Sequence, residues 1–217
     1  PSGADAPCAR SLAPPLPMPT PLLANLNPEQ LEAVTLPHGS ALVLAGAGSG
    51  KTRVLTTRIA WLLATGQASP LSVLAVTFTN KAAREMLLRL STLTPMSVRG
   101  MWIGTFHGLC NRMLRAHHRD ANLPQFFGIL DTADQLSLIK RMYKAHNLDD
   151  DRFPPKQLGW FIASAKDAGL RPSAVEAGDE FARRQVEHYA LYEAMCQREG
   201  VADFAELLLR SYELLMR

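Results

Sequence analysis

A glycine-rich loop, set between a short apolar run and an amphipathic stretch, constrains the fold of this chain more than any other feature. The apolar run covers residues 41–45, and after the loop Leu55, Ile59, Leu62 and Leu63 recur on one helical face. A strand, a glycine-rich loop and a helix in this order form the context in which a loop binds phosphate. We predict that the nucleotide-binding loop comprises Ala45, Gly46, Ala47, Gly48, Ser49, Gly50, Lys51 and Thr52.

Each residue type in this loop suits a part of a nucleoside triphosphate. Glycines let successive backbone N–H groups turn towards phosphate oxygens, and the positive end of the following helix adds to the attraction. Lys51 is expected to reach the terminal phosphates and the Thr52 hydroxyl to bind Mg²⁺, so we assign both to catalysis, with ATP and Mg²⁺ as cofactors. Ala45 stands where the strict motif has glycine. A glycine-rich turn beside a surface lysine is the alternative interpretation.

Apolar runs alternate with helical patterns in the first half of the chain. Residues 72–77 and 101–105 are typical of buried strands, and helices are expected from about Asn80 and from Phe106. Strands that alternate with helices predict an α/β fold with a parallel sheet. After about His118 the strand signal stops, and an all-helical second half is expected. Its helical patterns cover residues 132–146, 155–168, 181–199 and 203–216.

Composition places few limits on function. The formal net charge of +3 permits a nucleic-acid partner without establishing one. Cys8, Cys110 and Cys196 stand far apart and form no metal-ligand spacing, which fits a reducing compartment. No apolar run reaches the roughly 18 residues of a membrane span, and residues 1–24 lack the pattern of a signal peptide. We expect a cytoplasmic protein with no membrane partner.

Residues 1–24 are rich in proline, alanine and serine. Such a segment buries little apolar surface, and we expect a disordered tail that forms neither helix nor strand. A proline-rich docking peptide is the functional alternative.

Four ordered motifs carry a resemblance to a known family. Residues 26–30 (Leu-Asn-Pro-Glu-Gln) resemble its Q motif, and residues 45–53 resemble its phosphate loop, including the alanine in first place. Residues 75–83 (Ala-Val-Thr-Phe-Thr-Asn-Lys-Ala-Ala) resemble its motif Ia, and residues 104–109 (Gly-Thr-Phe-His-Gly-Leu) its next DNA-contacting motif. The family is that of superfamily 1 DNA helicases of the UvrD, Rep and PcrA type.

Further stretches extend the resemblance to Arg217, and they are most similar to the UvrD branch. These stretches are residues 115–118, 120–124, 166–172 and 203–210. The resemblance implies a partial RecA-like, ATP-binding subdomain 1A over residues 25–105. It also implies an inserted helical subdomain 1B over residues 106–217, whose last helix leads back to 1A.

The resemblance also implies an activity. Members of this family are ATP-dependent helicases that move three-prime to five-prime on single-stranded DNA and displace the other strand, commonly in repair or replication. Single-stranded DNA and its junction with duplex are therefore the expected partners. We expect this chain to be an amino-terminal portion of such an enzyme.

Three residues outside the loop are implied to face the nucleotide. Gln30 would contact adenine, since its amide can both donate and accept at the base edge. Asn27, Pro28 and Gln30 also fit a capping box at a helix start, which is the structural alternative. The resemblance places Arg53 beside the base or ribose. Arg89 is the weakest candidate, either near the phosphates or on a solvated helix.

Residues after the predicted strands are implied to contact DNA. Open α/β sheets bind ligands at the carboxyl ends of their strands. A base could therefore stack on Phe78, unless its ring belongs to the core, and Thr79 and Asn80 could bind phosphate or sugar, unless they cap the next helix. Thr105 and His107 receive the same interpretation. Arg115 belongs to a basic cluster that would suit duplex phosphates, the other members being Arg112, His117, His118 and Arg119.

The carboxylate pair and the arginines that complete hydrolysis in such enzymes are not recognisable in the sequence. The Asp179-Glu180-Phe181 stretch imitates part of that motif but follows no apolar strand, so we reject it. We expect this chain alone to be inactive in hydrolysis. Two alternatives to the helicase interpretation are a small P-loop kinase and a non-catalytic module that binds nucleotide or DNA.

Overall fold

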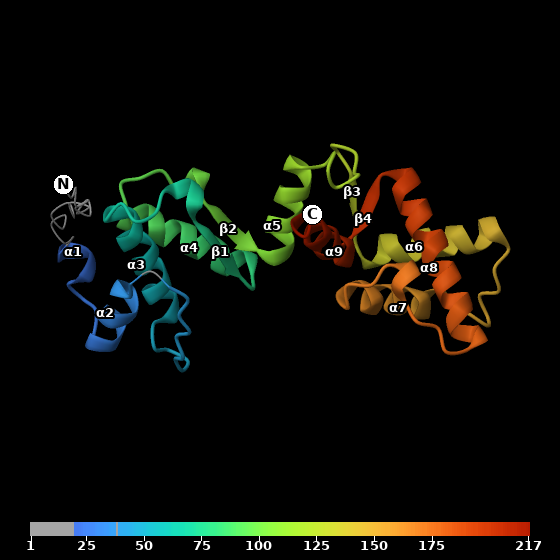
Figure 1. Cartoon of the computed structure of the whole chain (residues 1–217), viewed down its shortest axis with the longest axis horizontal. Helices are drawn as coiled ribbons and strands as arrows, with labels where there is room; N and C mark the ends of the chain where they lie inside the picture. Colours follow the sequence, from blue (N-terminus) through green and yellow to red (C-terminus); the bar gives the residue numbers. More distant parts are fainter. Residues whose placement is uncertain (1–19, 38) are drawn as a thin grey trace, which may run out of the picture. The chain divides into compact units, whose positions relative to one another are not determined.

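A computed structural model describes residues 20–37 and 39–217, and the chain divides between Gly104 and Thr105 into two compact units (Figure 1). The predicted tail lies outside the described residues up to position 19. The helices of the first unit are α1 (Thr20–Leu23), α2 (Pro28–Thr35), α3 (Lys51–Ala64) and α4 (Asn80–Leu93), and its strands are β1 (Leu74–Thr77) and β2 (Trp102–Thr105). Two short 3-10 turns, η1 (Pro70–Ser72) and η2 (Val98–Gly100), precede the strands.

The second unit is mainly helical. Its helices are α5 (Phe106–Ala116), α6 (Thr132–His146), α7 (Pro155–Asp167), α8 (Glu180–Glu199) and α9 (Phe204–Leu215), with a 3-10 turn η3 (Pro172–Ala174). Its strands are β3 (Gly128–Leu130) and β4 (Val201–Asp203). Among the residues that the structure describes, no helix combines the length and apolarity that crossing a membrane requires.

Helix α3 lies at the centre of the first unit. Ile59, Ala60 and Leu63 from α3 pack with Met86 and Leu90 from α4 in one buried cluster. Helix α2 also packs against α3. Because α2 and α4 both pack against α3, the position of α3 determines where the glycine-rich loop before it lies.

The short helix α1 corrects one expectation for the tail. Residues 20–23 are helical, and Leu22 packs against the buried cluster of the first unit. The prediction that residues 1–24 form no helix is therefore wrong at this end. The apolar contact explains the difference, because burial of Leu22 compensates for the poor helical propensity of a proline-rich segment.

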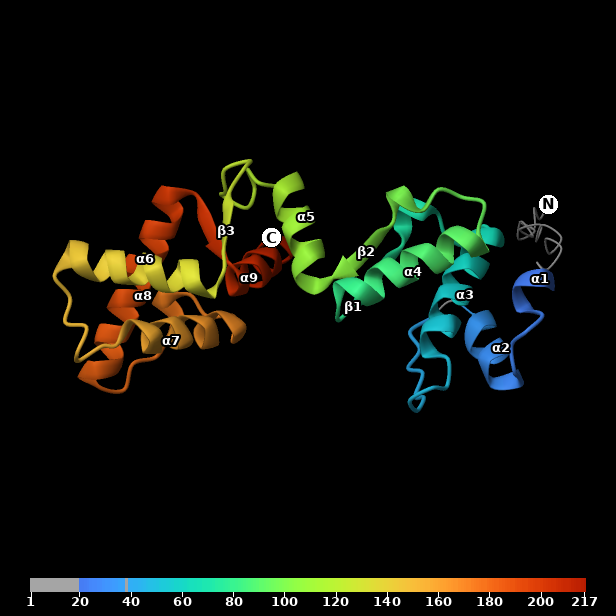
Figure 2. The same ribbon diagram turned by 180° about the vertical axis from the view of Figure 1, so that it is seen from behind.

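Strands β1 and β2 pair side by side in the first unit, as both views show (Figure 2). The Trp102 backbone N–H donates to the carbonyl of Val73 (2.9 Å), and the Thr77 hydroxyl donates to the carbonyl of Gly104 (3.5 Å). Both contacts advance in the same direction along the two segments, so the strands are parallel. The predicted parallel pairing is confirmed for these two strands.

The predicted strand at residues 41–45 is not formed. This segment has no regular secondary structure, and Leu42 and Leu44 are 84% and 85% exposed. A central strand is stable only when neighbouring strands pair with its backbone and helices cover its side chains. No strand in the described part of the chain pairs with this segment, so its apolar residues remain in solvent.

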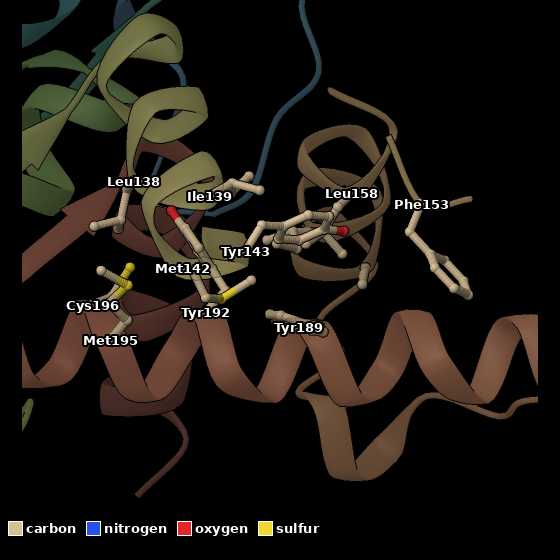
Figure 3. Packing of buried hydrophobic residues seen from close by; sticks show 12 residues of the cluster. Leu138, Ile139, Met142, Tyr143, Phe153, Leu158, Tyr189, Tyr192, Met195 and Cys196 are labelled. Atoms are coloured by element: carbon tan, nitrogen blue, oxygen red, sulfur yellow. The ribbon is translucent and has the colours of Figure 1, made fainter. Parts of the chain in front are cut away.

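The core of the second unit lies between α6, α7 and α8. Figure 3 shows side chains from these helices directed towards one another. Tyr189 and Tyr192 of α8 are fully buried there, although each carries a hydroxyl group. Each hydroxyl has an acceptor, the carbonyl of Leu170 for Tyr189 (3.1 Å) and Asp203 Oδ2 for Tyr192 (2.8 Å). The aliphatic members of the core are Leu138, Ile139, Met142, Leu158, Ile162, Ala165 and Met195.

A two-stranded sheet corrects the prediction of an all-helical second half. β3 and β4 pair in parallel, with Ile129 opposite Ala202. Gly200, with a φ of 66°, ends α8 in the left-handed region and lets the chain enter β4 directly. Each strand has three residues, too few to show alternation, and their partners are far apart in the sequence. Sequence periodicity could not reveal this pairing.

Buried charges connect α7, β4 and α9 within the second unit. Lys166 Nζ lies 2.9 Å from Asp203 Oδ2 and 2.8 Å from Glu206 Oε2, and all three side chains are at most 5% exposed. Arg171 and Arg210 also donate to Glu206. Burial opposes ionisation of Glu206, but the positive charges of Lys166, Arg171 and Arg210 outweigh it and lower its pKa to about 2.

We expect Glu206→Gln to flatten the acid dependence of stability of the second unit. The pKa of Glu206 is about 2 in the folded chain, against an ordinary value of 4.5. The ionised group therefore stabilises the fold above pH 4.5, and this contribution, about 3 kcal/mol, is lost as the pH falls towards about 2. Urea unfolding at a series of pH values, followed by near-UV circular dichroism of the buried tyrosines, measures the difference.

Glu187→Gln is the matched control, because Glu187 forms an exposed ion pair with Arg184 (3.0 Å). This variant should keep the acid dependence of the original chain. An identical pH dependence in Glu206→Gln and the original chain would contradict the role assigned to the buried charges.

Candidate functional site

The predicted nucleotide-binding loop turns sharply before α3. Gly48 (φ 76°) and Gly50 (φ 86°) adopt the left-handed conformation that glycine tolerates best. The Ser49 hydroxyl donates to the carbonyl of Gly46 (2.8 Å), which tightens the turn. Gly50 is the N-cap of α3 and has no side chain to cap the first N–H groups. An uncapped start of a helix of 14 residues attracts anions through these groups and through its dipole.

Lys51 folds back over the loop that it follows. Its ammonium group donates to the carbonyls of Ala45 (2.9 Å) and Gly46 (2.6 Å), and its side chain is exposed. Thr52 is also exposed in the first turn of α3. The sequence prediction placed both residues at the phosphates, and the structure brings them together with the loop glycines at the start of α3.

Gln30 connects α2 to the loop. The capping box considered from the sequence is present, because Asn27 Oδ1 accepts from the Gln30 N–H (2.8 Å) and Gln30 Oε1 accepts from the Asn27 N–H (3.2 Å). The Gln30 amide also donates to the carbonyl of Ser49 (3.1 Å). A Cβ atom on Gly50 would lie 3.0 Å from the Gln30 amide nitrogen, so this close approach favours glycine. Gln30 therefore has a structural role and at the same time lies beside the loop.

Arg53 and Arg89 line one surface pocket of the first unit, together with Asn25 and Leu93. The Arg53 guanidinium donates to the carbonyl of Asn25 (2.6 Å), just before the Q motif. Arg53 thus connects α3 to the segment that carries Gln30. Arg89 lines the same pocket from α4.

Phe78 follows β1 directly and is 97% exposed. The alternative that its ring belongs to the core is therefore wrong. The Thr79 hydroxyl accepts from the Ala82 N–H (3.1 Å) and caps α4, as the structural alternative for this residue predicted. Asn80 is exposed in the first turn of α4. The exposed aromatic ring remains the group at this strand end with the largest free surface.

Thr105 is the last residue of β2 and the first residue of the second unit, and His107 follows in α5. The Thr105 hydroxyl accepts from the Gly108 N–H (3.2 Å) and caps α5, in the same way that Thr79 caps α4. The exposed His107 ring forms a T-shaped pair with the ring of Phe204, with ring centroids 5.8 Å apart. Both residues thus have local structural contacts, and their contact with DNA stays a prediction.

Arg115 supports a loop of the second unit. Its guanidinium lies 4.4 Å from the centroid of the Phe127 ring and donates to the carbonyls of Phe127 (3.2 Å) and Gln125 (3.5 Å). The sequence assigned this arginine to a basic cluster and gave no signal for these contacts. Its contact with DNA also stays a prediction.

Two acidic stretches, one of them the stretch rejected as a catalytic motif, have structural roles. Asp179 caps α8 by accepting from the Ala182 N–H (2.7 Å). Asp149 accepts from the N–H groups of Asp151 (3.1 Å) and Arg152 (3.0 Å) in the turn after α6. In the described part of the chain, no group of three or more histidine, cysteine or acidic residues is arranged to hold a metal ion.

One arginine that the sequence analysis did not single out contacts α2, the helix that carries Gln30. Arg58 of α3 donates to backbone carbonyls at the end of α2. Its position in the sequence resembles that of any polar residue on an amphipathic helix. Only the tertiary packing of α2 on α3 brings it to those carbonyls.

Comparison with known proteins identifies the family. The UvrD/REP helicase N-terminal domain matches residues 26–217. DNA helicase II of Escherichia coli (strain K12) is 56% identical over 194 residues, which cover 89% of this chain and 27% of that protein. The ATP-dependent DNA helicase PcrA of Bacillus subtilis (strain 168) is 42% identical over 198 residues, which cover 90% of this chain and 27% of that protein. The chain spans about a quarter of the length of these relatives, and it belongs to the UvrD/REP helicase N-terminal domain family.

Proposed function

We propose that this chain is the ATP-binding and DNA-contacting front portion of an ATP-dependent DNA helicase. The observation that carries the proposal is the loop before α3. Two left-handed glycines, Gly48 and Gly50, form its turn, an uncapped helix start follows, and Lys51 Nζ lies 2.9 Å from the carbonyl of Ala45. These features together suit a triphosphate, because they present backbone N–H groups, a helix dipole and a cation to one place.

In this proposal the phosphates of ATP lie at the start of α3. Lys51 would exchange its two loop carbonyls for phosphate oxygens, and the Thr52 hydroxyl would hold Mg²⁺. Gln30 and Arg53 would face the base and ribose from the segment around α2. The family match supports ATP as the nucleotide, since the B. subtilis relative is named an ATP-dependent DNA helicase.

We propose further that this chain binds ATP without completing its hydrolysis. Water attack on a terminal phosphate needs a carboxylate that orients the water and arginines that stabilise the developing charge. No such pair is recognisable in the sequence. The loop, Lys51 and Thr52 would therefore supply phosphate and magnesium binding, and the rest of a whole helicase would supply the activating groups.

All but one of the proposed DNA contacts lie at or just after strand ends, and Arg115 lies in the last turn of α5. Phe78 is the strongest candidate because its exposed ring could stack on a base without further change. Thr79, Asn80, Thr105, His107 and Arg115 are proposed as lesser contacts, since several of them already serve local structure. We further propose that the two units correspond to a partial RecA-like subdomain 1A and a subdomain 1B. Movement three-prime to five-prime and a role in repair or replication are proposed from family resemblance.

The family match argues against one of the two alternatives to a helicase and does not test the other. A small P-loop kinase does not fit a chain whose residues 26–217 match a helicase domain. The other alternative is a non-catalytic module that keeps this fold and binds nucleic acid without nucleotide. Nucleotide binding by the chain discriminates it from the proposed function.

In a whole helicase that contains this portion, Lys51→Ala should lower DNA-stimulated ATP hydrolysis by at least about a hundredfold, because the transition state loses a principal counter-charge. Binding of single-stranded DNA should be retained, because Lys51 is proposed to contact the phosphates of ATP and not the DNA. Lys144→Ala removes an exposed lysine of the second unit and is the control. A Lys51→Ala enzyme that kept most of its turnover would contradict the assignment of Lys51 to the phosphates.

Phe78→Ala should weaken single-stranded DNA binding by roughly 1–3 kcal/mol if the ring stacks on a base. Fluorescence anisotropy at constant salt measures this, because phosphate contacts make such affinities salt-dependent. Phe126→Ala, which removes a ring that is 85% exposed in the second unit, is the matched control. Equal affinities for the original protein and Phe78→Ala would remove Phe78 from the DNA path.

A further inference from the structure

Arg58 of α3 contacts the carboxyl end of α2 through several backbone carbonyls. Its guanidinium donates through Nη1 to the carbonyls of Leu36 (2.9 Å), Val34 (3.0 Å) and Ala33 (3.4 Å), and through Nη2 to that of Pro37 (3.5 Å). The side chain is partly buried between the two helices. One side chain therefore binds two of the last four carbonyls of α2, those of Ala33 and Val34, together with the two carbonyls at positions 36 and 37 just beyond the helix.

The sequence explains why α2 needs this partner. Pro37 has no N–H group and restricts Leu36 to an extended conformation (φ −44°, ψ 136°), so the helix cannot continue. The last carbonyls of a helix need other donors, and the negative end of its dipole favours a cation. The planar guanidinium of an arginine meets several carbonyls at once, which an ammonium group does less well.

The amino end of α2 is bound to the nucleotide loop instead. Gln30 lies in the first turn, where it completes the capping box with Asn27 and donates to the carbonyl of Ser49 (3.1 Å). Between the two ends Val34 is fully buried. Helix α2 has only eight residues, so a contact at one end constrains the rotation and position of the other (Figure 1).

We infer that Arg58 is a positioning residue for nucleotide recognition, acting through α2 to hold the Gln30 amide beside the loop. The inference rests on the proposed function, in which Gln30 contacts the base of ATP. Without the guanidinium, the carboxyl end of α2 loses its donors and the helix shifts or frays. Gln30 then spends less time beside Ser49, while the loop glycines and Lys51 keep their own contacts. The loss therefore falls on recognition of the base and spares the phosphates.

Binding of ribose-labelled fluorescent ATP and GTP to the 217-residue chain tests this inference by anisotropy. We expect Arg58→Ala to weaken binding of the ATP analogue about tenfold and binding of the GTP analogue less than about twofold. Arg58→Lys keeps a cation that can reach some of the carbonyls. Its affinity for the ATP analogue should lie between those of the original chain and Arg58→Ala. Arg84→Ala, which removes an exposed arginine of α4, should change neither affinity.

The decisive comparison is a double-mutant cycle with Gln30→Ala. If Arg58 acts through Gln30, adding Arg58→Ala to Gln30→Ala should weaken binding of the ATP analogue by less than about twofold. An undiminished tenfold loss in that background, or equal losses for ATP and GTP, would overturn the inference and make Arg58 a general support of the fold. If thermal melting shows that Arg58→Ala does not fold, the cycle with Arg58→Lys is judged by the same criteria.

Failure of the proposed function has a different signature. An original chain that does not bind the ATP analogue, or binds it equally well after Lys51→Ala, contradicts the nucleotide site itself. Binding that depends on Lys51, together with additive effects of Arg58 and Gln30, contradicts only the positioning role.

Discussion

The first unit depends on where α3 begins. Two glycines in the left-handed region turn the chain immediately before Lys51, and no capping side chain occupies the helix start. From that point, α3 buries one side against α4 and packs against α2 with another. The same helix therefore organises the core and presents its positive end at the loop. A change that moved α3 would disturb the packing and the proposed phosphate site together.

Polar side chains around this helix serve structure and the proposed function at the same time. Gln30 completes the capping box of α2 with Asn27 and donates to the loop, and Arg53 donates to the carbonyl of Asn25. The second unit is organised differently, around Lys166 and the acidic groups of β4 and α9. Breaking such a buried set of charges is expected to cost more than losing a surface ion pair, because a charge is then left buried without a partner.

Local patterns predicted local structure well. The helix at 132–146, the cap at Thr79 and the loop glycines all follow from signals within a few residues. Contacts between distant segments were not predictable in this way. The segment 41–45 reads as a strand but has no partner among the described residues, and β3 pairs with β4 across the whole of α6, α7 and α8. The contacts of Arg58 and Arg115 with backbone carbonyls likewise depend on tertiary packing.

The proposed function depends on the loop before α3 binding the phosphates of ATP. Amide nitrogen–proton NMR spectra of the chain, recorded during titration with ATP and Mg²⁺, test it most directly. We expect the largest shifts on the amides from Gly46 to Thr52, with smaller shifts at Gln30. Unchanged loop resonances at saturating ATP, or changes confined to the second unit, would contradict it.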